Sequence, residues 1–253
     1  MRILSAVVAV GLFMVTVKAV EAAGSSSSIP ERHWKHGGLF GSFDRSALKR
    51  GFKVYKEVCS SCHGMRLLAY RNLVEIGFSE NEVKKIASDI EVAAEPNEEG
   101  EVEDRPGLPS DRFKSPFAND NAARAGNNGA LPPDLSLIVK ARAGGANYIY
   151  ALLNGYKEPP SDAKVPDGMN YNEAYAGQLI AMAPPLADEG IEYSDGTKAT
   201  IKQQAEDVVT FLSWAAEPEL EERKRLGIKV ILFLLLLTGL LYVVKRRIWA
   251  NAH

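Results

Sequence analysis

The chain has only two cysteines among its 253 residues, Cys59 and Cys62, and they stand three positions apart. A structural zinc site needs four good ligands. One built on this pair would therefore depend on the few other histidines, His33, His36 and His253. The chain also shows little apolar–polar alternation of period two and no internal repeat. These absences argue against a largely β domain and against a repeat array.

The two cysteines belong to the run Cys59-Ser60-Ser61-Cys62-His63. This pattern is typical of c-type haem attachment, in which both thiols add covalently to haem vinyl groups. The adjacent His63 would then bind the iron as the proximal ligand. The alternatives are half a zinc site, a short disulfide and a thioredoxin-like redox pair. The last would sit at a strand-to-helix turn, whereas residues 46–58 approach the motif with apolar side chains at helical spacing.

A six-coordinate haem iron needs a second axial ligand, and few side chains qualify. Met65 is only two residues past His63 and cannot reach the opposite face of the haem. Met169 and Met182 remain. Two prolines follow Met182 closely and restrict its backbone, whereas Met169 follows a flexible Asp–Gly turn. This chemistry favours Met182 and leaves Met169 as the alternative; a thioether ligand favours ferrous iron and raises the reduction potential.

Long apolar runs are also scarce, and the two present lie near the ends. Residues 1–22 combine Arg2, an apolar run over 6–17 and a small-residue cleavage signal, which predicts a secretory signal peptide. Residues 226–244 contain one charge, Lys229, and span roughly 29 Å as a helix, enough to cross a bilayer. The basic run 245–247 predicts a cytoplasmic end. We therefore expect a signal peptide (1–22), a periplasmic domain (23–222), an anchor (223–249) and a cytoplasmic tail (250–253).

The segment between these two runs lacks any excess of positive charge. Residues 23–222 contain 31 acidic and 21 basic side chains, a net charge of −10, whereas every charged residue after Glu222 is basic. This distribution argues against a nucleic-acid partner and favours a cationic protein partner. The most acidic stretch, 89–104, also contains glycine and proline at its bends, which predicts an exposed loop.

The predicted fold class is mainly α: a c-type cytochrome head with long loops and one C-terminal transmembrane helix. Capping boxes open expected helices at Ser79 and Thr200. The further expected helices after the motif are shorter and end near glycines. The expected helical ranges are 66–76, 79–90, 116–125, 136–142, 147–153 and 200–216.

Several longer segments carry a family resemblance. They are 50–63, 127–136, 140–145, 177–186, 211–218 and 223–227, and they cover nearly the whole mature chain in order. Together they resemble cytochrome c1. The pieces Ala181-Met-Ala-Pro-Pro185 and Trp214-Ala-Ala-Glu-Pro218, joined to a C-terminal anchor, are more specific than the haem motif, which many cytochromes share.

The resemblance implies an electron-carrying subunit of the ubiquinol–cytochrome c oxidoreductase that is not catalytic alone. It would pass electrons from the Rieske iron–sulfur protein to a soluble or tethered cationic cytochrome c. Implied partners are the cytochrome b subunit, which binds the quinol, membrane lipid and a second copy of the complex. The implied location is a bacterial inner membrane, with the head in the periplasm. A free-standing tethered cytochrome that feeds an oxidase, and a haem peroxidase or reductase, are the alternatives.

The resemblance also assigns individual residues. Cys59 and Cys62 match the residues that hold one covalent haem c, and His63 and Met182 match the axial ligands of its iron. Further positions match residues around the haem: Arg142 and Tyr148 at a propionate, and Asn128, Pro132 and Pro133 lining the pocket. A carbonyl in this last loop could orient His63 through its free ring N–H.

Overall fold

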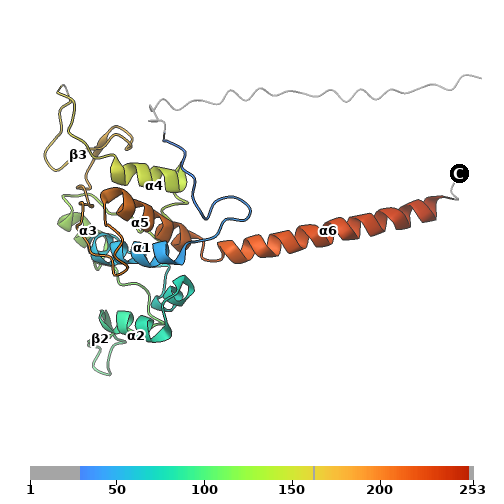
Figure 1. The fold of residues 1–253 in the computed structure, drawn as a ribbon. Coiled ribbons are helices and arrows are strands. Elements are labelled where there is room, and N and C mark those ends of the chain that lie inside the picture. Colours follow the sequence, from blue (N-terminus) through green and yellow to red (C-terminus); the bar gives the residue numbers. More distant parts are fainter. Residues whose placement is uncertain (1–28, 162, 251–253) are drawn as a thin grey trace, which may run out of the picture.

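Residues 29–161 and 163–250 are described by the computed structural model, in which a helical head carries one long projecting helix (Figure 1). The predicted signal peptide at 1–22 and residues 251–253 of the predicted tail lie outside these residues. The helices are α1 (Arg45–Glu57), α2 (Glu80–Ser88), α3 (Asp120–Gly126), α4 (Gly145–Asn154), α5 (Ile201–Ala216) and α6 (Leu220–Trp249). Two 3₁₀ turns are Cys59–Ser61 and Tyr70–Ile76, and two short hairpins pair β1 (Glu91–Ala93) with β2 (Asp104–Pro106) and β3 (Asn170–Tyr171) with β4 (Leu179–Ile180).

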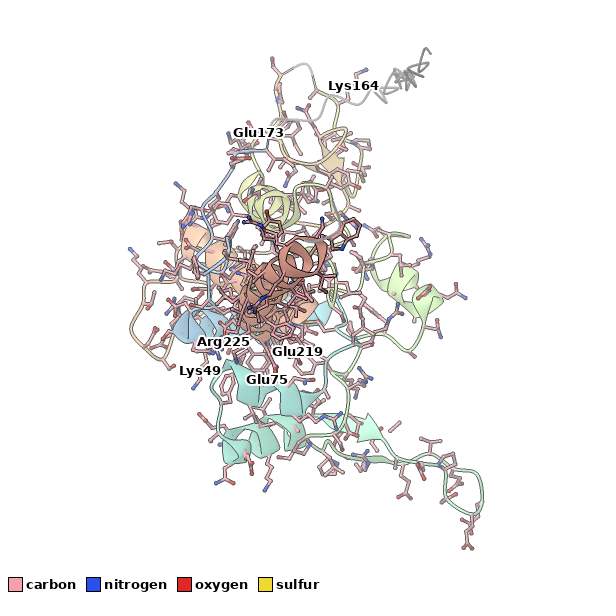
Figure 2. The ribbon with its side chains drawn as sticks, turned by 90° about the vertical axis from the view of Figure 1, so that its right-hand side faces the viewer. Lys49, Glu75, Lys164, Glu173, Glu219 and Arg225 are labelled. Atoms are coloured by element: carbon pink, nitrogen blue, oxygen red, sulfur yellow. The ribbon has the colours of Figure 1, made fainter. Side chains whose placement is uncertain are left out.

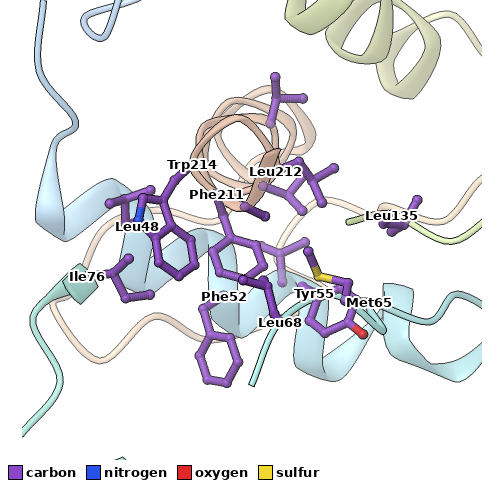
Figure 3. Close-up of a cluster of buried hydrophobic side chains, with 14 of the residues drawn as sticks. Leu48, Phe52, Tyr55, Met65, Leu68, Ile76, Leu135, Phe211, Leu212 and Trp214 are labelled. Carbon is purple, nitrogen blue, oxygen red and sulfur yellow. The ribbon is translucent and has the colours of Figure 1, made fainter. Parts of the chain in front are cut away.

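The core of the head is the packing of α1 against α5. Phe52 and Tyr55 on α1 contact Phe211 on α5, with ring centroids 5.8 and 5.9 Å apart. Leu48 and Trp214 are buried in the same cluster (Figure 3). Apolar side chains repeat along one face of each helix, so their pairing removes both faces from water. This contact holds the end of α1, and with it the motif that follows.

A buried ion pair fixes the register of α1 on α5. The carboxylate of Asp207 is 1% exposed and accepts two hydrogen bonds from the Arg50 guanidinium, from Nε and Nη2, each 2.9 Å long. Gln203 donates a third, 3.0 Å long. Arg50 also reaches Asp195 on the preceding loop at 2.8 Å, which holds the pKa of that carboxyl low, at about 2. A buried carboxylate with this many donors is well compensated for its loss of water.

Helix α5 packs closely against α1 at Gly51. A Cβ added there would lie 2.1 Å from the Asp207 carbonyl oxygen and 2.7 Å from the Phe211 Cβ. We expect Gly51→Ala to push α5 away and to lower the free energy of unfolding by about 1–3 kcal/mol, although alanine itself favours a helix. Thermal unfolding of the detergent-solubilised chain, followed by circular dichroism, measures this change.

Gly227→Ala on α6 is the matched control, because no atom lies within 4 Å of its added Cβ. This variant should unfold at the wild-type temperature or slightly above it. Equal destabilisation by both substitutions would show that the close contact at Gly51 does not limit the packing.

The expected helices at 79–90, 147–153 and 200–216 are confirmed within a few residues. Ser79 forms a reciprocal capping box with Glu82, and Thr200 accepts from the Gln203 N–H. Three other expectations were wrong in part. Residues 66–76 form a helix only from Tyr70, and it is 3₁₀; residues 116–125 become helical only after Asn119 caps α3.

Residues 136–142, the third of these, form turns rather than a helix. The Ser136 N–H donates to the Asp134 carboxylate, and its hydroxyl accepts from the Leu67 N–H at 3.1 Å. A side chain that is held by another segment cannot cap a helix, so the first turn at Ser136 lacks the side-chain cap that opens α2, α3 and α5.

The acidic stretch 89–104 is more ordered than expected. Its ends pair as β1 and β2, with Val92 opposite Arg105. Arg105 is held by a bidentate ion pair with Asp111, with lengths of 2.6 and 2.9 Å. The intervening residues 94–103 remain largely exposed, as predicted. The base of the loop is therefore a β1–β2 hairpin, which local composition did not predict.

Helix α6 contains the predicted membrane-spanning run. It has 30 residues and a mean hydropathy of 2.5 in its most apolar window, and none of that window is buried by the head. At the usual helical rise its length is about 45 Å, more than the hydrocarbon thickness of a bilayer. Figure 2 looks along α6 and shows Glu219 and Arg225 near the base of this helix. The chain therefore has one C-terminal helix long and apolar enough to cross a membrane.

Candidate functional site

The cysteine motif follows directly from the C-terminus of α1. Cys59–Ser61 is a single 3₁₀ turn in which the N–H groups of Cys62 and His63 both donate to the Cys59 carbonyl, at 3.1 and 2.9 Å. The motif thus follows a helix and not a strand. A thioredoxin-like redox pair would follow a strand, so this arrangement argues against that alternative. Both cysteines are half-buried and unpaired with each other.

The His63 ring is oriented by a segment 70 residues further along the chain. Its Nδ1 lies 2.7 Å from the carbonyl oxygen of Pro133. A carbonyl oxygen can only accept a hydrogen bond, so Nδ1 must carry the proton. In the neutral ring, the other nitrogen, Nε2, then keeps the lone pair that binds a metal. A carbonyl partner for His63 was expected from this loop, and the structure identifies it as that of Pro133.

Burial keeps the side chains of His63 and Cys59 uncharged. Burial lowers the pKa of His63, so the imidazole is neutral at physiological pH, and the Pro133 carbonyl only partly opposes this effect. Burial also raises the pKa of the Cys59 thiol to about 12. Neutral imidazole is the form that ligates iron, so the protonation states fit the chemistry that the motif predicts.

Residues 64–67 and 134–136 lie side by side and hold Pro133 in place. The Leu135 N–H donates to the Gly64 carbonyl at 2.8 Å, and the Arg66 N–H donates to the Asp134 carboxylate at 2.9 Å. The Tyr55 hydroxyl also donates to the His63 carbonyl at 3.3 Å. These contacts fix the backbone on both sides of the His63 ring.

The loop that leads to Pro133 extends toward the methionine region. Asn128 has a left-handed backbone, with φ at 50°, and its side-chain amide would lie 3.1 Å from a Cβ placed on Gly168. Pro132 is half-buried, whereas Pro133 and Asn128 are exposed. One loop therefore connects the His63 side of the site with the segment that precedes Met169.

Met169 and Met182 lie at the same end of the β3–β4 hairpin. Met169 directly precedes β3, and Met182 follows β4 by two residues; Asn170 is opposite Ile180. The Tyr156 hydroxyl donates to the Met182 carbonyl at 3.0 Å. Met169 lines a surface cavity of about 550 Å³ together with Tyr156, Pro184 and Pro185. Both methionines are half-buried, so the fold brings the two sequence candidates together and leaves Met182 with the more constrained backbone.

Arg142 and Tyr148 come together at the start of α4. The Gly145 N–H donates to the Arg142 carbonyl at 3.0 Å, so the chain turns back on itself at two glycines with positive φ. Burial raises the pKa of Tyr148, and the positive charge of Arg142 opposes this rise. Arg142 itself is exposed. A cation beside a phenol hydroxyl suits a carboxylate ligand.

The zinc alternative finds no support. Across residues 29–161 and 163–250, no group of three or more His, Cys, Asp and Glu side chains gathers closely enough to hold a metal ion. His36 stacks on Phe43 instead, with centroids 4.8 Å apart, and burial lowers its pKa to about 4. His253 lies outside the described residues.

The sequence model of the Cytochrome C1 family matches residues 34–252. The chain belongs to the cytochrome c1 family. It is 46% identical to a protein named cytochrome c1 from Rhodospirillum rubrum, over 97% of this chain and 96% of that one. It is 48% identical to "Cytochrome c1, heme protein, mitochondrial" from Saccharomyces cerevisiae, over 94% of this chain and 77% of that one.

A third relative is named cytochrome b/c1, from Bradyrhizobium diazoefficiens. It is 44% identical over 98% of this chain, which spans 39% of that longer protein. Cytochrome c1 membership confirms the predicted family, the mainly helical fold and the role of an electron-carrying haem subunit of respiratory complex III.

Three contributors to this cytochrome c1 site were absent from the sequence predictions. Tyr156 holds the Met182 backbone, Tyr55 bonds to the His63 carbonyl, and Asp134 bonds to the Arg66 N–H. Asp134 follows Pro132-Pro133, and an Asp after two prolines could have indicated a side-chain-capped turn. The two tyrosines carry no local signal, because each acts through its terminal hydroxyl on a backbone group 8 or 26 residues further along the chain.

Proposed function

We propose that this chain carries electrons from the Rieske iron–sulfur protein through one covalent haem c to a soluble or tethered c-type cytochrome. It does so within the ubiquinol–cytochrome c oxidoreductase. The observation that carries the proposal is the 2.7 Å contact from His63 Nδ1 to the Pro133 carbonyl, next to two half-buried thiols. A ring held in this way presents Nε2 as a ligand with a fixed direction.

We assign the haem contacts as follows. Cys59 and Cys62 would form thioether bonds to the haem, and His63 and Met182 would ligate its iron. Arg142 and Tyr148 would bind a propionate through a charge-assisted hydrogen bond and a phenol hydroxyl. Asn128, Pro132 and Pro133 would line the pocket. Met182 is preferred to Met169 because the Tyr156 hydrogen bond and two following prolines restrict its backbone.

The haem supplies a reversible one-electron couple when it is bound. The protein adjusts this couple: the thioether of Met182 favours the ferrous state, and burial of the site disfavours extra positive charge. With His63 and Met182 both bound, the iron would have no open position for a substrate. The head therefore acts by outer-sphere transfer and does not catalyse a reaction alone.

The charge of the head supports a cationic cytochrome as acceptor. A net charge of −10 over residues 23–222 speeds encounter with a basic partner more than it tightens the complex. The relative named cytochrome b/c1 supports a cytochrome b subunit as a second partner. The Rieske protein, membrane lipid and a second copy of the complex complete the proposed partners; nucleic acid is not one of them.

We further propose that residues 1–22 are a signal peptide and that the head, 23–222, lies in the periplasm of a bacterium. The anchor, 223–249, then spans the inner membrane, and 250–253 lie in the cytoplasm. The apolar character of α6 and the basic run 245–247 support this orientation. The similarity to the Rhodospirillum rubrum protein supports the bacterial assignment.

The test is to purify the tagged chain from its membranes in mild detergent and to record its spectrum as a quinol is added. We expect b-type haem and an iron–sulfur subunit to copurify, and we expect quinol to reduce the c haem. The control is the same sample after a harsher detergent has removed those subunits, which should abolish reduction by quinol.

Three results would contradict the proposal. A chain that copurifies with no other subunit, with a haem that quinol never reduces, would indicate a free-standing tethered carrier. Ready binding of carbon monoxide by the ferrous protein would indicate an open iron site, and therefore a peroxidase or reductase. A colourless purified protein would contain no haem and would favour a zinc site at Cys59 and Cys62.

A further inference from the structure

A short loop before α1 presents two large apolar side chains to solvent. In the loop 35–42, Leu39 is 57% exposed and Phe40 is 83% exposed. The Ser42 N–H donates to the Lys35 carbonyl at 3.1 Å and closes the loop. The tip, 37–41, consists only of glycine, leucine and phenylalanine, so no polar side chain projects from it. An exposed pair of this kind needs an apolar partner.

The loop is compact and holds its tip in one position. The Gly37 N–H donates to the Trp34 carbonyl at 2.8 Å. At the other end, a Cβ added to Gly41 would lie 1.8 Å from the Gly37 carbonyl oxygen, so the two arms of the loop are in contact. At the base, Phe43 is buried and stacks on His36. The ordered loop therefore holds Leu39 and Phe40 in defined positions at its tip.

Lys224 ties both ends of this loop to the first turns of α6. Its Nζ donates to the His36 carbonyl at 2.7 Å and to the Gly41 carbonyl at 3.0 Å. Lys224 precedes the apolar run of α6, which starts at Leu226, by two residues, or about 3 Å along the helix. The loop therefore lies at the level where α6 becomes apolar, beside the start of that helix (Figure 1).

The surroundings of the loop suit the boundary of a bilayer. Arg225 is exposed on the same turns of α6, where it can meet lipid phosphates, whereas the exposed Arg223 is paired with Glu217 at the end of α5. Arg225 belongs to the second turn of α6 and is labelled in Figure 2, which views the face of the head from which that helix leaves. Aromatic side chains are enriched at membrane interfaces, and cationic side chains pair with the headgroups there.

We propose that the loop 35–42 inserts Leu39 and Phe40 into the interface of the membrane that α6 spans. The occupant of this apolar tip is lipid, because Lys224 holds the base of the tip against α6 two residues before the apolar run of that helix begins. The head then has two membrane attachments, α6 and the loop, and two attachments restrict its tilt and rotation. This inference rests on the proposed membrane anchor.

The test replaces Phe40 with p-benzoylphenylalanine in the full chain, assembled with its partner subunits in native membranes. After irradiation, mass spectrometry identifies what has become attached to the peptide that contains position 40. We expect a phospholipid adduct. An adduct to another subunit would overturn the proposal by identifying a protein partner, and the absence of any lipid adduct would overturn it as well.

Two control positions separate this inference from the anchor. The same probe at Leu234 in α6 should form lipid adducts, whereas at Leu108, an exposed leucine of the head, it should form none. A lipid adduct at 234 without one at 40 contradicts the loop proposal and leaves the anchor intact. Without lipid adducts at 234, the anchor itself fails, and the loop proposal fails with it. Equal adducts at 40 and 108 would show nonspecific labelling and overturn the loop proposal.

A second variant tests the connection to α6. Lys224→Met removes both hydrogen bonds from Nζ while it keeps a side chain of similar length. We expect the loss of most of the lipid adduct at position 40 and an unchanged adduct at 234. An undiminished adduct at 40 would show that Lys224 does not place the loop.

Discussion

Met182→Leu is expected to leave the haem covalently attached and to lower its reduction potential by about a few tenths of a volt. A thioether stabilises ferrous iron, and leucine offers no ligand in its place. The ferrous form therefore loses stability relative to the ferric form. A potentiometric titration of the purified variant measures the shift, and a haem stain after denaturing electrophoresis reports whether the haem remains attached.

Met169→Leu is the matched control, because Met169 lies at the same end of the β3–β4 hairpin and is also half-buried. This variant should keep the wild-type potential. The opposite pair of results, with the potential unchanged in Met182→Leu and lowered in Met169→Leu, would move the ligand assignment to Met169. Met169 also lines the neighbouring cavity with Pro184 and Pro185, so this experiment decides between two residues that the fold places together.

The double variant Cys59→Ser, Cys62→Ser is expected to lose all covalently bound haem. Serine hydroxyls do not form the thioether bonds that the motif requires, and the described residues include no other cysteine. The intact mass of the chain should fall by one haem, and the haem stain of the denatured chain should disappear. Haem can still enter the pocket of this variant, but denaturation would release it.

Ser61→Ala is the control for the double variant. The Ser61 hydroxyl donates to the Val58 carbonyl at 2.8 Å and lies 3.8 Å from the Cys62 sulfur. Its removal therefore perturbs the same turn without removing a thiol. This variant should retain its haem. A haem that survives denaturation in the double variant would show that the attachment involves other atoms, and the assignment of Cys59 and Cys62 would then be wrong.

Features that depend on neighbouring residues were predictable from the sequence. The capping box at Ser79 joins residues three positions apart, and the motif Cys59–His63 forms one turn bonded within itself. The apolar run at 226–244 lies wholly inside α6. Each depends on contacts within about one helical turn, or on composition, so residue order is sufficient.

Features that depend on distant partners were predicted less well. The helix expected at 136–142 does not form, because Asp134 and Leu67 engage the backbone and the side chain of Ser136. The hairpin at the ends of the acidic stretch pairs Val92 with Arg105, 13 residues further along the chain. The helix or strand propensity of a short segment is weak compared with such tertiary contacts. Where another segment packs against the chain, these contacts therefore decide the local structure.

The residue types of the proposed site, two thiols, an imidazole and a thioether, were predicted from the order of amino acids alone. Their orientation was decided by packing. Pro133 bonds to His63 across 70 residues, Tyr156 bonds to Met182 across 26, and Lys224 bonds to His36 across 188. Such pairs form only after α1 packs on α5 and the loops close around them. Each contact combines a backbone group with a distant side chain, and neither partner has a local pattern that identifies the other.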